Sequence, residues 1–191
     1  ILFVVLMLSF RILVHAETVT TSVTVGNSPP VITAGPAEST ASDGTTPTNE
    51  GANVTFQATA TDSNAEDYYL AICKTDSITP GAAGAAPTCA ASSTWCVSTA
   101  TDSGVQASCS YTTVNGDAES NVWYAFVCDN NSTASSCSLT GDDGNGATGS
   151  PFKVNHDPSF SAVSDNGGGG ADSGADPGGT MTFTATASDG D

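Results

Sequence analysis

The segment Gly51–Asp62 reads G-A-N-V-T-F-Q-A-T-A-T-D, and Gly178–Asp189 repeats its pattern as G-G-T-M-T-F-T-A-T-A-S-D. From Val54 to Ala60 every second residue is apolar, which is the two-residue period of a strand with one buried face. The sequence therefore predicts the same β-strand twice in one chain, which means that a structural unit is repeated.

A second pair of matching segments gives the length of the repeat. V-T-V-G-N-S-P-P at Val23–Pro30 corresponds to F-K-V-N-H-D-P-S at Phe152–Ser159. Both pairs are separated by about 127 to 129 residues, the size of a small domain and far longer than a solenoid repeat. We therefore expect a complete unit over residues 29–155, a lone terminal-type strand within residues 17–28, and the first strands of an incomplete second unit over residues 156–191.

The complete unit is predicted to be all-β. Long helix-forming runs are absent, and alternation of β-branched residues recurs. Tyr68–Cys73 is apolar on both faces, as a central strand is, and a polar loop is expected through Asn49. The seven strands expected are Val31–Ala34, Val54–Thr61, Tyr68–Cys73, Thr94–Ser98, Ala107–Thr112, Asn121–Cys128 and a closing strand near Phe152–Val154. Such strands predict an immunoglobulin-like β-sandwich, with Trp95 and Trp123 in its core rather than in a carbohydrate-binding surface.

All six cysteines lie inside the complete unit. An even number behind a secretory-type start predicts disulfides and an oxidising compartment, whereas zinc fits poorly because C-x-x-C is absent and histidine is scarce. Cys73 and Cys128 end neighbouring antiparallel strands, which puts them about 15–20 Å apart and out of reach of each other. The predicted pairs are local ones that staple the loops: Cys73–Cys89, Cys96–Cys109 and Cys128–Cys137.

Residues 1–16 form an apolar segment, I-L-F-V-V-L-M-L-S-F-R-I-L-V-H-A, that is short for a membrane span of about 20 residues. Val14-His15-Ala16 fits a signal-peptidase site, so we expect cleavage before Glu17 and secretion. If the segment is retained, it would be an apolar anchor, or a helix in a filament core as in type IV pilins. It is the only part of the chain that we expect to meet a membrane.

Charge and histidine content exclude two classes of function. The chain carries 20 acidic and 3 basic residues, a net charge of −17, so a nucleic-acid partner, which requires clustered Lys and Arg, is not expected. An acidic surface favours divalent cations instead. The two histidines are His15, in the apolar segment, and His156, at a unit boundary, and no G-x-S-x-G motif is present. We therefore do not expect an enzyme.

The acidic segments at the unit boundaries suggest a metal. The junction F-K-V-N-H-D-P-S-F, N-E-G at Asn49–Gly51 and A-T-D-S-N-A-E-D at Ala60–Asp67 resemble bacterial cadherin-like and related immunoglobulin-like surface repeats. In those families acidic loops at domain boundaries bind Ca²⁺, a cation that takes oxygen ligands, and stiffen the array. The chain lacks a D-R-E motif and a full D-x-N-D-N, and ordinary turn-forming Asp and Asn is the alternative. The resemblance implies ligands at Glu50, Asp62, Asp67, Asn155 and Asp157, with Glu66 as a further candidate.

Glycosylation is a further modification that this surface could carry. Asn53, Asn130 and Asn131 lie in N-x-S/T sequons, and Asp129 stands two residues before Asn131, as bacterial N-glycosylation prefers. Asn53 opens a strand whereas Asn131 lies in a loop, so we expect Asn131 to be the better acceptor of the two. The composition is equally compatible with O-glycosylation of Ser and Thr.

Two functions fit these features. The first is a secreted building block of a prokaryotic surface filament or stalk, in which the strand Thr18–Val25 of one copy completes the open unit of the next, head to tail. The residues exchanged would be Thr18, Val19, Thr21, Val23 and Val25. The second is the N-terminal part of a long adhesin, followed by further repeats of the same chain, whose loops bind a glycan or a partner protein.

Overall fold

The computed structural model describes residues 26–165, 178 and 182–189. Every regular element longer than three residues in that part of the chain is a β-strand, which confirms the all-β prediction. Within the same residues no helix is long and apolar enough to cross a membrane. The apolar segment 1–16 and the expected donor strand Thr18–Val25 lie outside the described residues.

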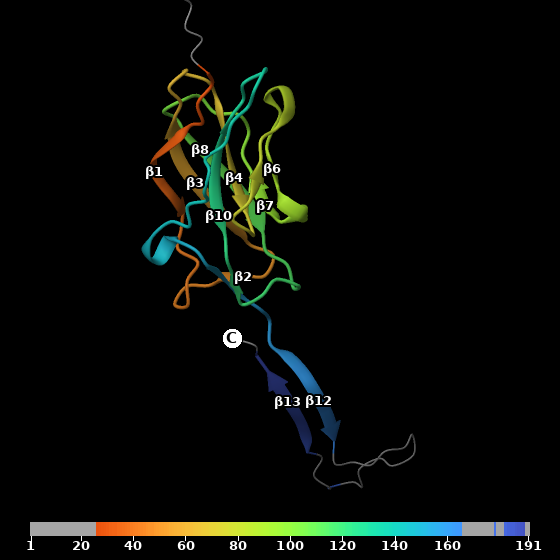
Figure 1. Cartoon of the computed structure of the whole chain (residues 1–191). Helices are drawn as coiled ribbons and strands as arrows, with labels where there is room; N and C mark the ends of the chain where they lie inside the picture. The colour runs from red at the N-terminus through yellow and green to blue at the C-terminus, as the bar shows by residue number, and fades with distance from the viewer. Residues whose placement is uncertain (1–25, 166–177, 179–181, 190–191) are drawn as a thin grey trace, which may run out of the picture.

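Two three-stranded antiparallel sheets form the body of the molecule (Figure 1). The first contains, in order, β1 (Val31–Glu38), β3 (Asn53–Thr61) and β8 (Gln106–Thr112). The second contains, in order, β10 (Tyr124–Asp129), β4 (Tyr68–Cys73) and β7 (Thr94–Val97). One cluster of buried side chains takes members from both sheets, so the core lies between them.

A third, small sheet lies where the chain leaves the body. β11 (Phe152–Asn155) pairs antiparallel with β9 (Ser120–Asn121) and parallel with β2 (Thr48–Asn49), a short strand inside the segment expected to be a loop. The remaining short elements are β5 (Ile78–Thr79), β6 (Thr88–Cys89) and the 3₁₀ turns η1 (Ala82–Gly84), η2 (Ala90–Ser92) and η3 (Gly146–Thr148).

The single strand expected over Asn121–Cys128 is wrong in one respect, because it is broken after Asn121. β9 pairs with β11, whereas β10 pairs with β4, so the chain changes sheets between them. Trp123 sits at the break, with its side chain fully buried in the core and its backbone N–H donated to Ser150 Oγ at 2.8 Å. The buried indole and the side-chain hydrogen bond replace the ladder contacts that an unbroken strand would have made.

The core follows the alternation seen in the sequence. β3 buries every second side chain from Val54 to Ala60, as predicted. Phe56 is fully buried, with edge-to-face contacts to Trp123 at 5.3 Å and to Phe152 at 6.0 Å between ring centroids. Trp95 is also buried, so both tryptophans are core residues, as expected. Aromatic pairs of this geometry contribute about 0.5–1.5 kcal/mol each beyond the area that they bury.

The cysteines form the three local disulfides predicted from the sequence, Cys73–Cys89, Cys96–Cys109 and Cys128–Cys137. Cys73 lies opposite Tyr124 in the β4–β10 ladder and Cys128 lies opposite Tyr69, so these two cysteines are at opposite ends of the pair, as expected. Cys96 and Cys109 join β7 to β8 and thereby link the two main sheets. With all six cysteines paired, the protein belongs to an oxidising compartment.

Beyond β11 the chain forms a separate antiparallel hairpin of β12 (Ser159–Asp165) and β13 (Phe183–Ser188) (Figure 1). Its register matches that of the β1–β3 pair over the first three residue pairs, whereas a second slip, between Ala34 and Ala37, occurs in β1 and has no counterpart in β12. The first partners are Val31 with Thr61 in one pair and Ser159 with Ser188 in the other. Both pairs then slip at the same point, between Ile32 and Ala34 in β1 and between Phe160 and Ala162 in β12.

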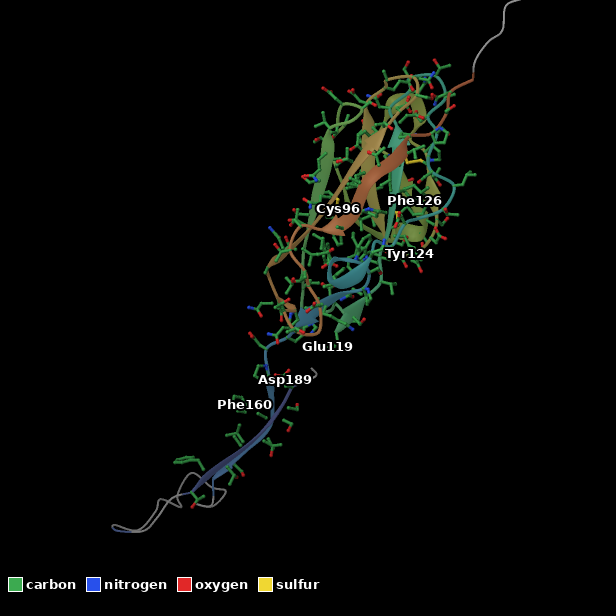
Figure 2. The ribbon with its side chains drawn as sticks, turned by 90° about the vertical axis from the view of Figure 1, so that its left-hand side faces the viewer. Cys96, Glu119, Tyr124, Phe126, Phe160 and Asp189 are labelled. Carbon is green, nitrogen blue, oxygen red and sulfur yellow. A yellow bond between two sulfur atoms is a disulfide. The ribbon has the colours of Figure 1, made fainter. Side chains whose placement is uncertain are left out.

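The hairpin carries large apolar side chains without cover from the described residues. Phe160 and Val163 are each 70% exposed and Phe183 is 71% exposed, although Phe56, at the position of Phe183 in the sequence repeat, is fully buried. Figure 2 shows Phe160 on the hairpin, away from the side chains that fill the body. The hairpin therefore has the strand pairing of β1–β3 but not the core.

Candidate cation site

Three carboxylates gather at the end of the body where residues 26–30 join it, here called the N-terminal pole. Asp62 follows β3, Glu66 lies in the loop before β4, and Asp129 ends β10. One oxygen from each lies within 4.8 Å of the other two. Because β3 and β10 end at this pole and β4 begins there, the fold brings together residues up to 67 positions apart in the chain.

A tight turn orients Asp62. Its Oδ1 accepts the N–H of Asn64 at 2.6 Å, and its carbonyl accepts the N–H of Ala65 at 3.1 Å. Ala65 adopts a left-handed conformation with φ of 59°, which turns the chain sharply and places Glu66 beside Asp62. Because Oδ1 is committed to the turn, Oδ2 is the oxygen available to the cluster.

Asp129 is held by the loop that follows it. Its side chain is fully buried, with Oδ1 accepting the N–H of Asn131 and Oδ2 accepting the N–H of Ser136, both at 3.0 Å. The Nδ2 of Asn27, in the segment before β1, donates to the same Oδ2 at 2.7 Å. An ionised carboxylate offers about four lone-pair sites, so Asp129 retains capacity for a cation.

Three oxygens at this pole are buried and accept no hydrogen bond within the described part of the chain: Asp62 Oδ2, Glu66 Oε2 and Asn27 Oδ1. Asp62 itself is only 7% exposed. A buried acceptor without a partner costs about 1–3 kcal/mol, and more when it is charged. Three such oxygens beside the buried Asp129 carboxylate are the arrangement that a bound cation would stabilise.

The donors fit calcium best among the common metals. Asp62, Glu66, Asp129 and Asn27 offer oxygen only, which suits Ca²⁺ or Mg²⁺ and disfavours zinc. Ca²⁺ binds oxygens at about 2.3–2.6 Å, so two of its ligands lie at most about 5 Å apart, and carboxylate oxygens within 4.8 Å of one another fit inside that span. Ca²⁺ also accepts irregular geometry, whereas Mg²⁺ demands a near-ideal octahedron and keeps several waters.

The ligands expected from the sequence do not form one cluster. Asp62 and Glu66 belong to the candidate site, whereas the half-buried Asp67 is outside the three-carboxylate group and its carbonyl accepts the N–H of Asn130. Glu50 and Asn155 lie at the other end of β3, about 30 Å away for nine residues of strand, so one ion cannot bind both groups.

That opposite end, here called the C-terminal pole, has its own polar contacts. Glu50 donates its N–H to the carbonyl of Asn155 at 3.0 Å, and Asn155 Nδ2 donates to Asn49 Oδ1 at 3.0 Å. His156 Nδ1 lies 2.8 Å from Glu119 Oε1. Figure 2 places Glu119 and Asp189 on the two sides of the connection to the hairpin, and the expected ligand Asp157 is exposed there.

Sequence reasoning missed Asn27 and Asp129. Each carried a signal, because Asn27 stands at the position of His156 in the repeated junction, and Asp129 directly follows the apolar strand that ends in Cys128. Their contact joins residues 102 positions apart, which only the folded chain reveals.

The structure also bears on the glycosylation sites. Asn131 donates its Nδ2 to Glu66 Oε1 at 2.6 Å, and its Oδ1 accepts the N–H groups of Thr133 and Ala134 at 2.8 Å each. Its amide nitrogen is therefore engaged in the candidate cation site. Asn53 is exposed and uses only its Oδ1, which accepts the hydroxyl of Thr112 at 2.7 Å. Asn53 is therefore the more exposed of the two asparagines, and modification of Asn131 stays a prediction.

Comparisons with known proteins do not identify the chain: no family model, no curated protein and no solved structure matches it.

Proposed function

We propose that this chain belongs to an extracellular structural protein, a module of a tandem array that builds a prokaryotic surface filament or stalk. The observation that carries the proposal is the register that β1–β3 and β12–β13 share over their first three residue pairs, including the first slip at the same point. A hairpin that starts a second unit in the same way as the first is what an array of like modules requires.

The strand order supports an immunoglobulin-like sandwich for each unit. One sheet reads β1-β3-β8 and the other β10-β4-β7, with β11 beside β9 and parallel to β2. In immunoglobulin-like domains the last strand lies beside the strand that precedes it, in the second sheet. Here that preceding strand is broken into β9 and β10, and β11 pairs with its first part, β9. Such modules, stapled by local disulfides, suit an extracellular stalk.

The exposed apolar side chains of the hairpin indicate the kind of structure that would cover it. Phe56 is covered by Trp123, next to β10, and by Phe152 of β11, so Phe183 needs equivalents of both. A donor strand from a neighbouring copy would occupy the place of β11. It would supply an equivalent of Phe152 but not of Trp123. We therefore propose that the remaining strands of a second unit cover the hairpin, with the terminal strand, equivalent to β11, supplied by Thr18–Val25 of the next copy.

Calcium would have a structural role in this array. Asn27 lies in the segment that leads into the unit and bonds to both Asp129 Oδ2 and the carbonyl of Ala134. A cation held by Asp62, Glu66 and Asp129 would fix this segment against the body. The chemistry that the ion supplies is electrostatic cross-linking of carboxylates, with no reaction.

The experiment that tests the proposed function is the intact mass of the native protein combined with electron microscopy of the same preparation. Filaments or stalks with a regular repeat along their length are expected. Compact, separate particles that do not associate with the cell surface would overturn the proposal. Intact mass then distinguishes short subunits joined by strand exchange from one long chain of repeats.

A second function, adhesion to a partner, is favoured by one observation. Leu139 is 97% exposed beside an open groove of about 510 Å³ lined by Pro29–Ile32 and Ser138–Asp143. Val31, which is 64% exposed, lines the same groove, and adjoining exposed apolar side chains are a feature of partner-binding surfaces. The same array would then carry its ligand on the side of the module, and a Leu139→Ser variant that loses adhesion but not assembly would identify this role.

A further inference from the structure

The loop between Cys128 and Cys137 contacts almost the whole candidate cation site. It begins with the ligand Asp129, and its Asn131 holds Glu66 Oε1 through a hydrogen bond of 2.6 Å. The carbonyl of Ala134 accepts Asn27 Nδ2 at 2.8 Å, which fixes the segment before β1. Of the four residues with oxygens at the site, Asp129 belongs to this loop, Glu66 and Asn27 are hydrogen-bonded to it, and Asp62 is oriented by its own turn.

The loop also holds the carboxylate of Asp129 through backbone hydrogen bonds. The N–H groups of Asn131 and Ser136 bind the two oxygens of Asp129, one from each side of the loop. Inside the loop, the Ser135 hydroxyl donates to the carbonyl of Asn131 at 2.9 Å. The loop is polar and makes no hydrophobic core of its own, so its conformation depends on these bonds and on the closure of its ends.

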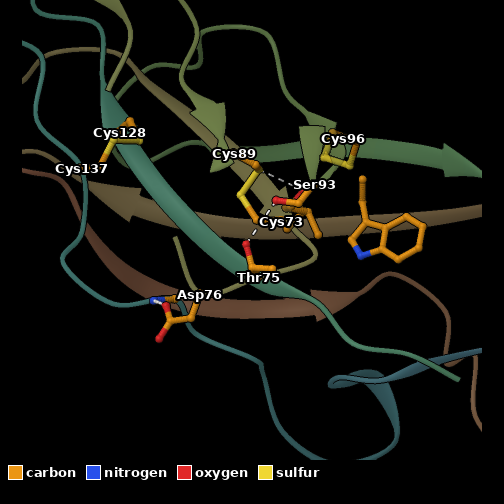
Figure 3. The surroundings of a disulfide bond; sticks show 12 residues. Cys73, Thr75, Asp76, Cys89, Ser93, Cys96, Cys128 and Cys137 are labelled. Atoms are coloured by element: carbon orange, nitrogen blue, oxygen red, sulfur yellow. Dashed lines mark hydrogen bonds between the residues drawn. A yellow bond between two sulfur atoms is a disulfide. The ribbon is translucent and has the colours of Figure 1, made fainter. Parts of the chain in front are cut away.

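The disulfide provides that closure. Cys128 and Cys137 lie nine positions apart and pair across the start and end of the loop, next to Asp129 and Ser136. Figure 3 shows this pair apart from the Cys73–Cys89 bridge. In the β4–β10 ladder Cys73 lies opposite Tyr124, five residues before Asp129, so the Cys73–Cys89 bridge is at the far end of the strand from the cation site.

We propose that the Cys128–Cys137 disulfide is a positioning element of the cation site, which holds Asp129, Asn131 and Ala134 in the arrangement that binds calcium. Without it, calcium binding must order a free loop, and that entropy cost reduces the affinity. Removal of groups that orient metal ligands typically weakens binding by about 10–100-fold, and an effect of that size is expected here. The inference rests on the proposed calcium site.

The test compares two disulfides in the full chain. Calcium is titrated by isothermal calorimetry into the wild type, a Cys128→Ser/Cys137→Ser variant and a matched Cys73→Ser/Cys89→Ser variant, with circular dichroism to verify that each is folded. The first variant is expected to bind calcium at least about tenfold more weakly than the wild type. The matched variant is expected to keep its affinity within about twofold, because its bridge lies at the other end of the β4–β10 pair from the site.

The outcomes separate the two levels of the proposal. Absence of calcium binding by the wild type would remove the proposed site itself. Unchanged calcium affinity in the Cys128→Ser/Cys137→Ser variant, or an equal decrease of calcium affinity in both variants, would overturn the inference. The proposed calcium site would not be affected by either result.

A second measurement uses the unaltered protein, in case a variant does not fold. Dithiothreitol reduces each disulfide to two thiols and is itself oxidised to a cyclic disulfide, and mass spectrometry after alkylation follows each pair. Both cysteines are buried, so reduction of Cys128–Cys137 requires local opening of the loop, and bound calcium would stabilise the closed loop. Calcium is therefore expected to slow reduction of Cys128–Cys137 several-fold and to leave Cys73–Cys89 unaffected. Equal rates for Cys128–Cys137 with and without calcium would contradict the inference.

Discussion

Glu38 shows how a single buried carboxylate makes stability depend on pH. The side chain is 1% exposed, with Oε1 accepting Trp123 Nε1 at 3.2 Å and Oε2 accepting the N–H of Ser42 at 2.7 Å. Burial raises the pKa of Glu38 from 4.5 to about 7, against the opposing effect of these two hydrogen bonds and with a smaller contribution from the nearby charge of Asp43. The folded protein therefore holds this proton more tightly than the unfolded chain does.

The consequence is a loss of stability as the pH rises. The contribution of protonated Glu38 to the free energy of unfolding is present in full below pH 4.5 and is lost as the pH rises through about 7. Glu38→Gln removes the ionisable group, although its NH₂ cannot accept one of the two N–H groups that the carboxylate binds. The variant is therefore expected to lack the loss of about 2–3 kcal/mol of unfolding free energy that the wild type shows between pH 4.5 and pH 8. Urea unfolding at the two pH values measures the difference.

An exposed carboxylate serves as the control for this prediction. Glu50→Gln removes the same charge at the C-terminal pole, where the side chain is exposed, and is expected to change stability by less than about 0.5 kcal/mol at either pH. If Glu38→Gln and the wild type show the same change between pH 4.5 and pH 8, Glu38 is not the group responsible.

At the scale of elements, the repeat offers a matched pair of phenylalanines. Phe56 on β3 is fully buried, whereas Phe183, its counterpart on β13, is 71% exposed. Phe56→Ala is expected to cost about 3–5 kcal/mol of unfolding free energy because it leaves a cavity beside Trp123 and Phe152. Phe183→Ala is expected to change the unfolding of the body by less than about 0.5 kcal/mol.

Thermal and urea unfolding of the two variants measure this contrast. A large decrease in the unfolding free energy of the body in Phe183→Ala would mean that the hairpin packs on the body and is not a separate element.

The elements also show how far the sequence could predict the structure. The alternation from Val54 to Ala60 is a local pattern, and β3 has the predicted buried face. The disulfides were predictable because antiparallel pairing separates Cys73 from Cys128, and each cysteine was then paired with a near neighbour in the chain. The break before β10 was not predictable, because Trp123 is as apolar as its strand neighbours and only the pairing of β9 with β11 shows that the chain changes sheets.

The candidate site was predictable only in part, because some of its residues come from distant segments of the chain. Asp62 and Glu66 are close in the chain, and their acidic turn is visible in the sequence. Asp129 and Asn27 reach the site through contacts between distant segments. A local pattern cannot distinguish such residues from ordinary turn-forming Asp and Asn.

At the scale of the whole molecule, the cation site lies where the segment before β1 meets the body. Asn27 in that segment bonds to Asp129 and to Ala134. We expect calcium to protect the segment around Gly26–Pro30 from proteinase K and a chelator to expose it, because cleavage requires local opening. Mass spectrometry of the fragments measures the cleavage rate, and Asn27→Ala is expected to be cut at the same rate in both conditions.

The opposite outcome would be informative for the array. Equal cleavage of the wild type with calcium and with a chelator would mean that the ion does not fix this segment, and calcium would then have no role in stiffening the junction.

The most direct test of the proposed site is a calorimetric calcium titration of the metal-free chain. The wild type is expected to bind an ion that is lost in Asp62→Asn and in Asp129→Asn. Glu50→Gln and Asp157→Asn, which remove the same charge at the C-terminal pole, are expected to retain that ion. No heat of binding in the wild type, or a titration unchanged in Asp62→Asn and Asp129→Asn, would contradict a calcium site at the N-terminal pole.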